Sequence, residues 1–261
     1  MTVVNPLEAV GPRELVATFA EIGREITARS GEGGVLDGLI RSAVKRIPGT
    51  EWASITQYRA PRFDTVASTD PRASQADKLQ YALGSGPCLD AIVEDTIFRP
   101  DDIANDPLWP EFGRRVSEEF GVASMLSFRL EIEADDVVGC LNLYSRERGA
   151  FSDDDLPMGL LLATHAAWAL ATQIANHKAA TLQIAVESNR DIGIAIGILM
   201  ASHKITREAA FDLLRITSQG SHRKLREVAA DVMDTGMLSV PRGTEDGNRN
   251  RPRPGPPRQV A

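Results

Sequence analysis

The sequence feature that most limits the fold is a regular spacing of small and apolar residues in the second half of the chain. From Leu156 to Ser188 these residues recur in alternating steps of four and three. This spacing predicts one long helix with a coiled-coil seam. Ser152, followed by three aspartates, is a suitable N-cap for its start. The seam positions are Leu156, Leu160, Ala163, Ala167, Leu170, Ile174, His177, Thr181, Ile184 and Ser188.

Two packings of this helix are compatible with the seam. It can pair with the same helix of a second chain, as a parallel homodimer, or pack within one chain against a helix expected from Pro12 to Thr27. The alanines, His177 and Thr181 bury little surface, so the seam is weak in places. We expect the homodimer.

Three short amphipathic segments follow between residues 187 and 234. The first, Glu187–Ser202, carries apolar residues at helical spacing; the second begins at the N-cap Thr206, and the third follows Ser221 and ends near Gly236. The expected buried residues are Ile192, Ala195, Ile196 and Leu199, then Ala209, Ala210, Phe211, Leu213 and Leu214, then Leu225, Val228, Ala229 and Val232. About 48 residues is near the lower limit for an independent domain, so we expect this module to rest on a partner or a neighbouring domain.

The sequence of this module resembles the ANTAR domain family. The resemblance lies in Ala195, Gly197, Leu199 and Met200, the apolar set of the second segment, Ser218, and Arg223-Lys224-Leu225. It implies a three-helix module that binds RNA hairpins and acts in transcription antitermination. Ile196 stands where many members have lysine, and His222 where many have asparagine. Gly197, inside a helix, predicts a close approach of a second helix.

Charge is divided unevenly along the chain. Residues 1–175 hold 16 Lys and Arg against 27 Asp and Glu, residues 176–238 hold 8 against 7, and residues 239–261 hold 5 against 2. The N-terminal part should therefore repel a phosphate backbone, and we place RNA binding on the C-terminal module. Cations crowd the start of its third helix, and others flank the first. The candidate RNA-binding residues are Arg223, Lys224 and Arg226, extended by Lys204 and Arg190, with His203 as a stacking ring.

The N-terminal part has the pattern of an α+β domain. Apolar stripes at Leu15–Ile26 and Val35–Val44 predict helices. Alternating patterns at 52–56 and 63–67, and again at 124–130 and 137–144, predict two strand pairs. Helices followed by hairpins favour an antiparallel sheet with helices packed on it.

Three phrases, at 84–90, 106–112 and 139–145, resemble the GAF domain family. The resemblance implies a PAS-like antiparallel sheet with a cavity that holds a small molecule in some members. The candidate pocket residues are Trp52, Cys88, Trp109 and Tyr144, although such aromatic and cysteine positions also suit a core. The expected organisation is a flexible N-terminus (1–11), a GAF sensor (12–155), a coiled-coil connector helix (156–186), an ANTAR module (187–238) and a disordered, proline-rich tail (239–261).

No catalytic motif is present in the sequence, and we expect no enzymatic activity. His165 follows the GAF-like part as a phospho-accepting histidine would, but nothing resembles an ATP-binding domain. No cysteines or histidines stand at metal-ligand spacing, and the apolar run Gly159–Ala171 is too short to span a membrane. Two cysteines and no signal-peptide pattern favour the cytoplasm.

These observations predict a cytoplasmic, signal-responsive transcription regulator that binds RNA hairpins, forms a homodimer and needs no metal. A small-molecule ligand of the GAF part is compatible with the sequence, but its identity is open. The alternative function is a protein–protein adaptor whose three-helix module docks another chain.

Overall fold

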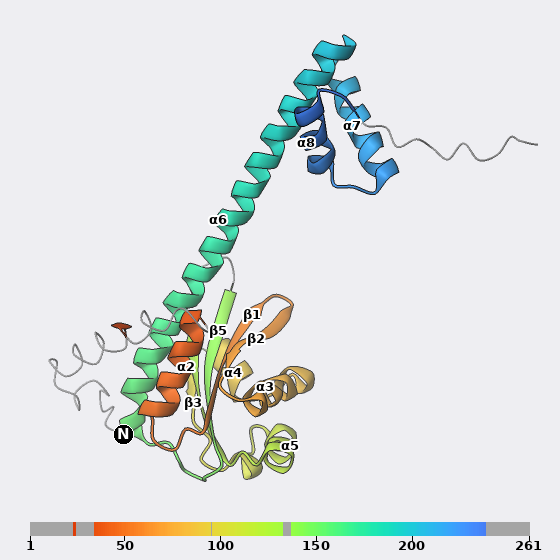
Figure 1. The fold of residues 1–261 in the computed structure, drawn as a ribbon. Coiled ribbons are helices and arrows are strands. Elements are labelled where there is room, and N and C mark those ends of the chain that lie inside the picture. Colours follow the sequence, from red (N-terminus) through yellow and green to blue (C-terminus); the bar gives the residue numbers. More distant parts are fainter. Residues whose placement is uncertain (1–22, 25–33, 95, 133–136, 239–261) are drawn as a thin grey trace, which may run out of the picture. The chain divides into compact units, whose positions relative to one another are not determined.

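The computed structural model describes residues 23–24, 34–94, 96–132 and 137–238 (Figure 1). The chain divides into two compact units, residues 1–177 and 178–261, and each is described separately below. The predicted helix from Pro12 to Thr27 lies outside the described residues except at positions 23 and 24, which are helical.

The first unit is built on a five-stranded antiparallel sheet in the order β2-β1-β5-β4-β3. The strands are β1 (Trp52–Arg59), β2 (Arg62–Ser68), β3 (Ile97–Phe98), β4 (Ser124–Leu130) and β5 (Val137–Ser145). In the central pair, Trp52 lies opposite Tyr144 and Thr56 opposite Cys140. Both predicted strand pairs are confirmed. The edge strand β3 was not predicted, because two residues are too few to show an alternating pattern.

The side chains of each strand alternate between two helical layers. One face of the sheet packs on α2 (Gly34–Arg46) and on the first part of α6 (Leu156–His203), through residues such as Ile55, Phe128 and Leu141. The other face carries α3 (Pro71–Leu83), α4 (Pro87–Glu94) and α5 (Pro110–Phe120), as Figure 1 shows. The sheet is therefore covered on both faces, and each face can hold a separate site.

Local sequence signals set the ends of these helices. Asp70 caps α3 by accepting a hydrogen bond from the Arg72 backbone N–H at 2.9 Å, and Pro71 occupies the first helical position. Gly84 and Gly121 end α3 and α5 in the left-handed conformation. The predicted cap at Ser152 is confirmed as a capping box with Asp155, over the short 3-10 helix η2 (Asp153–Asp155) that leads into α6. A second 3-10 turn, η1, spans Ile103–Asn105.

The helix α6 is continuous over 48 residues, so the predicted connector and the first ANTAR-like segment form one helix. The seam prediction, however, is wrong for part of its length. Ala163, Ala167 and Leu170 are buried in the first unit's own core, with residues of the sheet and of α2. The alanines allow the helix to lie close to the sheet. Leu156 and Ile174 are partly buried at the same core, whereas Leu160, His177, Thr181 and Ile184 are exposed.

By length and composition, the helical stretch Asp153–His203 is apolar enough to cross a membrane, with a mean hydropathy of 1.3 in its most apolar window. About two fifths of that window, 39%, is buried inside the protein. A core helix of a soluble protein meets the same criterion.

The second unit consists of the last part of α6 with α7 (Arg207–Ser221) and α8 (Leu225–Thr235). Thr206 caps α7 through a hydrogen bond from the Ala209 N–H, as predicted. The buried core is small and made of short apolar side chains. It contains Ala195, Ile196, Leu199, Ala210, Leu214, Val228, Ala229 and Val232.

Two expectations for this unit are wrong. Ala209, Phe211 and Leu213 are exposed, because a helix in a three-helix module buries one stripe, here Ala210, Leu214 and Thr217. A Cβ atom on Gly197 would meet nothing within 4 Å, so no second helix among the described residues approaches it closely.

Candidate functional site

The exposed start of α8 is the strongest candidate for an anion-binding site. Lys224 is the N-cap residue and makes no side-chain cap, and Arg226 is exposed in the first turn. Within the described parts of the chain neither cation has an ion-pair partner. The first N–H groups of a helix have no partner inside the helix and form the positive end of its dipole. This end of α8 therefore combines two exposed cations with backbone donors, a combination that suits an anion.

Arg223, a predicted RNA-binding residue, is already engaged in an ion pair within the module. Its guanidinium donates to both carboxylate oxygens of Asp231, at 2.6 and 3.2 Å, and lies within 3.9 Å of Glu227. The hydrogen bond from Arg223 lowers the pKa of the Asp231 carboxyl. The sequence analysis did not predict this partner, which lies eight positions after Arg223. Arg223 thus ties the turn before α8 to the middle of that helix.

The predicted RNA-binding residues lie at two ends of the module. His203 and Lys204 precede α7, while Lys224 and Arg226 follow it, and the 15 residues of α7 correspond to a length of about 22 Å. Both early residues are exposed, and Lys204 has a left-handed backbone with φ of 53°. The six residues consequently do not form one compact patch.

Arg190 belongs with the α8 end of the module rather than with His203. It is exposed on α6, thirteen residues and therefore about 20 Å of helix before His203. Because Ala210 and Leu214 of α7 share a core with Ala195 and Leu199 of α6, α7 runs back along α6 toward the level of Arg190.

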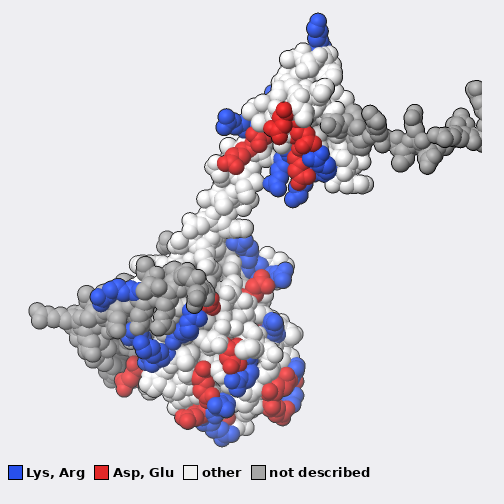
Figure 2. All heavy atoms as spheres, viewed as in Figure 1, with Lys and Arg blue, Asp and Glu red and all other residues white. Residues whose placement is uncertain are grey.

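Acidic side chains interrupt the positive surface of the module. Figure 2 shows blue and red side chains intermixed on the visible face of the helices. Arg215 of α7, for example, pairs with Asp212 at 2.9 Å. The free cations at the start of α8 are therefore local, and not part of a broad basic face.

A second candidate site is a buried polar network on the sheet face that carries α3, α4 and α5. Its centre is Asp77 of α3, which has no exposed surface. The Asp77 carboxyl accepts hydrogen bonds from the Tyr144 hydroxyl at 2.5 Å, from Asn142 Nδ2 at 3.0 Å and from the Thr65 hydroxyl at 3.0 Å. Burial raises its pKa to about 6, and these hydrogen bonds limit the rise.

The network extends across the central strands. The Tyr81 hydroxyl bonds to the Thr56 and Thr65 hydroxyls at 2.7 and 3.0 Å, and burial raises its pKa. Asn142 Oδ1 accepts from the Ser127 hydroxyl at 3.0 Å and from the Cys140 thiol at 3.2 Å. This site was not predicted from the sequence. Its signals were an aspartate on the alanine stripe of α3 and polar residues at alternate positions of β1 and β5.

The four candidate pocket residues lie on this same side of the sheet, but all are buried. Trp52, Trp109 and Tyr144 belong to one apolar cluster and Cys88 to another, and none is more than 4% exposed. Trp109 Nε1 donates to Asp90 at 2.6 Å, and the Arg72 guanidinium lies 4.1 Å from the Trp52 ring centre. The structure gives these four residues core positions, which was the alternative that the sequence left open.

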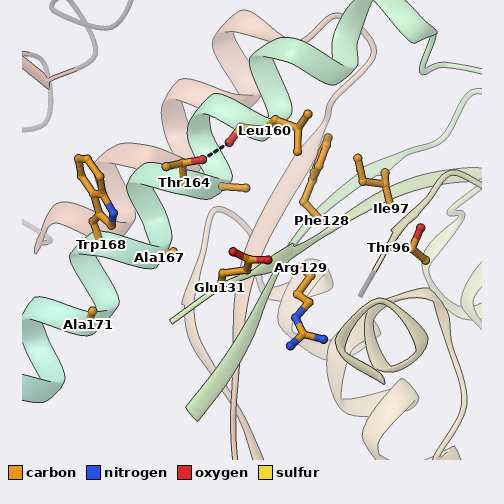
Figure 3. Close-up of a pocket in the computed structure, with 11 residues that line it drawn as sticks. Thr96, Ile97, Phe128, Arg129, Glu131, Leu160, Thr164, Ala167, Trp168 and Ala171 are labelled. Atoms are coloured by element: carbon orange, nitrogen blue, oxygen red, sulfur yellow. Dashed lines mark hydrogen bonds between the residues drawn. The ribbon is translucent and has the colours of Figure 1, made fainter. Parts of the chain in front are cut away.

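A groove of about 780 Å³ lies on the α6 side of the first unit. Figure 3 shows Leu160, Thr164, Trp168 and Ala171 following α6 along one side of it. The other side is formed by residues of β3 and β4 and the segments next to them, Thr96, Ile97, Phe128, Arg129 and Glu131. None of the four candidate pocket residues lines this groove. Among the described residues, no three His, Cys, Asp or Glu side chains form a metal-binding group.

Comparison with known families agrees with this architecture. The sequence matches the family model of the GAF domain over residues 30–171 and that of the ANTAR domain over residues 180–233. The chain therefore belongs to the GAF domain family and carries an ANTAR domain after the GAF domain. The GAF match ends beyond the predicted boundary at residue 155, in keeping with the burial of Ala163 and Leu170 in the GAF core.

No curated protein matches the sequence. Similar solved structures include the GAF domain of a phosphoenolpyruvate-protein phosphotransferase from Coxiella burnetii, with 17% identity, coverage of 67% of this chain and 99% of that chain, and a TM-score of 0.49. The corresponding Acinetobacter domain has 16% identity, coverage of 64% and 97%, and a TM-score of 0.49. A type II free methionine-R-sulfoxide reductase from Thermoplasma acidophilum has 16% identity, coverage of 53% and 90%, and a TM-score of 0.42.

Proposed function

We propose that this protein is a cytoplasmic, signal-responsive transcription regulator that binds RNA hairpins through its ANTAR domain and acts by antitermination. The GAF domain is its sensor. The proposal is supported by the succession of a GAF and an ANTAR match in one chain and by the free cations at the start of α8. The second unit contains 8 Lys and Arg against 7 Asp and Glu from residue 178 to 238, so affinity has to come from local contacts.

Lys224 and Arg226 are the proposed phosphate contacts. Both are exposed, and the backbone N–H groups at the start of α8 can donate further hydrogen bonds to a phosphate. Hairpin recognition also needs contacts to unpaired loop bases. His203 and Lys204, about 22 Å away along α7, suit a second contact on the same RNA.

The test is binding of a pool of fluorescent RNA hairpins to the full-length protein across a salt series. Lys224→Ala with Arg226→Ala should weaken binding by about 1–3 kcal/mol and reduce the salt slope by roughly one for each phosphate that is no longer bound. Arg215→Ala is the matched control, since this arginine is exposed but paired with Asp212. An equal weakening by Arg251→Ala with Arg253→Ala would show nonspecific electrostatic attraction and contradict the proposal.

The sensor role places a small-molecule ligand in the GAF domain. Gln80 Nε2 is buried and has no hydrogen-bond partner among the described residues, beside the network centred on Asp77. A buried donor without a partner costs free energy, which a polar ligand or a water would recover. A thermal-shift screen of small polar metabolites should find a stabilising compound whose effect disappears in Gln80→Leu.

We also propose that the protein is a homodimer held by α6. All side chains of residues 175–187 are exposed, including Leu182, Ile184 and Val186 at 53–62%. Over the preceding residues the exposed stripe is Leu160, Thr164 and Trp168. Residues three or four positions apart lie on the same face of a helix, and continuing this spacing from Trp168 leads to Leu182 and Val186, not to Ile184. The proposed dimer contact is therefore the face of α6 that contains Leu182 and Val186.

A protein–protein adaptor is the second candidate function. Phe211, Leu213 and Ile216 of α7 are 37–59% exposed, an apolar set with no cover in the described chain. In that case hairpin binding would be absent or independent of salt. Phe211→Ser and Ile216→Ser would then impair the regulator in cells, whereas Lys224→Ala with Arg226→Ala would not.

A further inference from the structure

We infer that Cys88 and Cys140 form a reversible intramolecular disulfide when the GAF domain meets a small oxidant of the hydroperoxide class. The two cysteines are 52 positions apart, and the sequence alone gives no reason to pair them. In the structure they lie in one buried cluster with Ala91 and Ile92, where α4 packs on β5. Both are free thiols in this structure.

The two thiols come from different elements, and both are fully buried. Cys88 is the second residue of α4. Cys140 is fully buried in the central strand β5, and burial together with the neighbouring Cys88 thiol raises its pKa. Because burial disfavours the ionised form of Cys140, we assign Cys88 as the attacking sulfur and Cys140 as the resolving thiol.

The chemistry is balanced by peroxide as the oxidant. The Cys88 sulfur attacks one peroxide oxygen, the O–O bond breaks, and the thiol proton passes to the leaving hydroxide, so that the products are a sulfenic acid and water. The Cys140 thiol then attacks the sulfenic sulfur, the S–O bond breaks, and the hydroxyl leaves with the thiol proton as a second water. Two thiols are oxidised to one disulfide, and one peroxide is reduced to two waters.

The residues around the two cysteines determine both how an oxidant reaches them and what a disulfide would change. Four side chains packed around the cluster, Tyr58, Phe63, Phe98 and Val138, are only partly buried, so one layer separates it from solvent. A small uncharged oxidant suits such a site. Disulfide formation removes the S–H donor that Cys140 directs at Asn142 Oδ1. Since Asn142 also donates to Asp77, the oxidation changes the polar network on the sheet face that carries α3, α4 and α5.

The test is hydrogen peroxide treatment of the full-length protein, followed by thiol counting in denaturant and intact mass spectrometry. The chain has only two cysteines, so an intramolecular disulfide joins these two and no others. We expect the thiol count to fall from two to zero, the monomer mass to fall by about 2 Da for two hydrogens, and dithiothreitol to reverse both changes. Cys88→Ser and Cys140→Ser should each show no such decrease in mass.

Three results would overturn the inference. They are two thiols that remain titratable, a mass gain of whole oxygen atoms that dithiothreitol does not reverse, and disulfide-linked chains instead of an internal bond. Thiol counting and mass need no RNA, so failure here leaves the proposed RNA-binding function intact, and the reverse also holds.

Discussion

The carboxyl group of Asp77 makes the stability of the GAF domain depend on pH in an unusual direction. Burial raises its pKa from 3.8 to about 6 in the folded protein. Between these two values the folded state keeps a proton that the unfolded state has released. This contribution is therefore most favourable below pH 3.8, falls as pH rises, and is constant above about pH 6. Raising the pKa of Asp77 from 3.8 to about 6 corresponds to a contribution of about 3 kcal/mol to the free energy of unfolding.

Asp77→Asn tests this contribution. Asparagine can still accept the Tyr144 hydrogen bond but carries no titrating proton. The free energy of unfolding of the native protein, minus that of Asp77→Asn, should fall by about 2 kcal/mol between pH 4 and pH 7. Urea unfolding can be followed by fluorescence, since all three tryptophans lie in the first unit. A difference in the free energy of unfolding that does not change with pH would show that Asp77 has the same pKa in the folded and unfolded states.

Replacing two helical glycines, Gly159 and Gly197, with alanine should change stability in opposite directions. A Cβ on Gly159 would lie 2.0 Å from the Phe128 ring, whereas one on Gly197 would meet nothing within 4 Å. Gly159→Ala should therefore destabilise the first unit by about 1–3 kcal/mol, measured by urea unfolding with tryptophan fluorescence. Gly197→Ala should stabilise the second unit by up to about 1 kcal/mol, measured by circular dichroism. A decrease in stability in Gly197→Ala would indicate that another chain packs on this glycine.

At the scale of elements, α6 shows what spacing can and cannot predict. Steps of three and four identify a helix and its buried stripe, and both were predicted. They do not identify what covers the stripe, because a helix on its own sheet and a helix in a coiled coil need the same spacing. Ala163, Ala167 and Leu170 are covered by the GAF core. For the same reason Leu170→Lys would unfold that domain and could not report on a dimer.

The proposed dimer makes a prediction that separates the two faces of α6. Leu182→Lys with Val186→Lys should convert the dimer to monomers in sedimentation, because two like charges per chain would have to be buried at the interface. Ile184→Lys is the control on the other face, and it should leave the dimer intact. If Ile184→Lys gave monomers and the Leu182→Lys with Val186→Lys variant stayed dimeric, the seam predicted from the sequence would be supported instead. If both variants stayed dimeric, α6 would not be the dimer interface.

At the scale of the whole molecule, the fold class and domain order were predictable, while the sites were less so. The long strands showed clear alternation, and the ANTAR-like module carried enough specific positions to be recognised. Pairs of residues distant in sequence were not predicted. Asp77 accepts hydrogen bonds from side chains of β2 and β5, and Cys88 and Cys140 lie in one buried cluster. Such partners depend on how helices dock, which single-sequence periodicity does not encode.

The order of the strands also restricts how this protein can assemble. The outermost strands are β2 and β3, and unpaired backbone groups at such positions invite a foreign strand to add on. Here β3 offers only Ile97 and Phe98, and β2 places the charged Arg62 and Asp64 on its exposed surface. Short and charged borders disfavour strand addition. Growth into fibres by sheet extension is thus disfavoured.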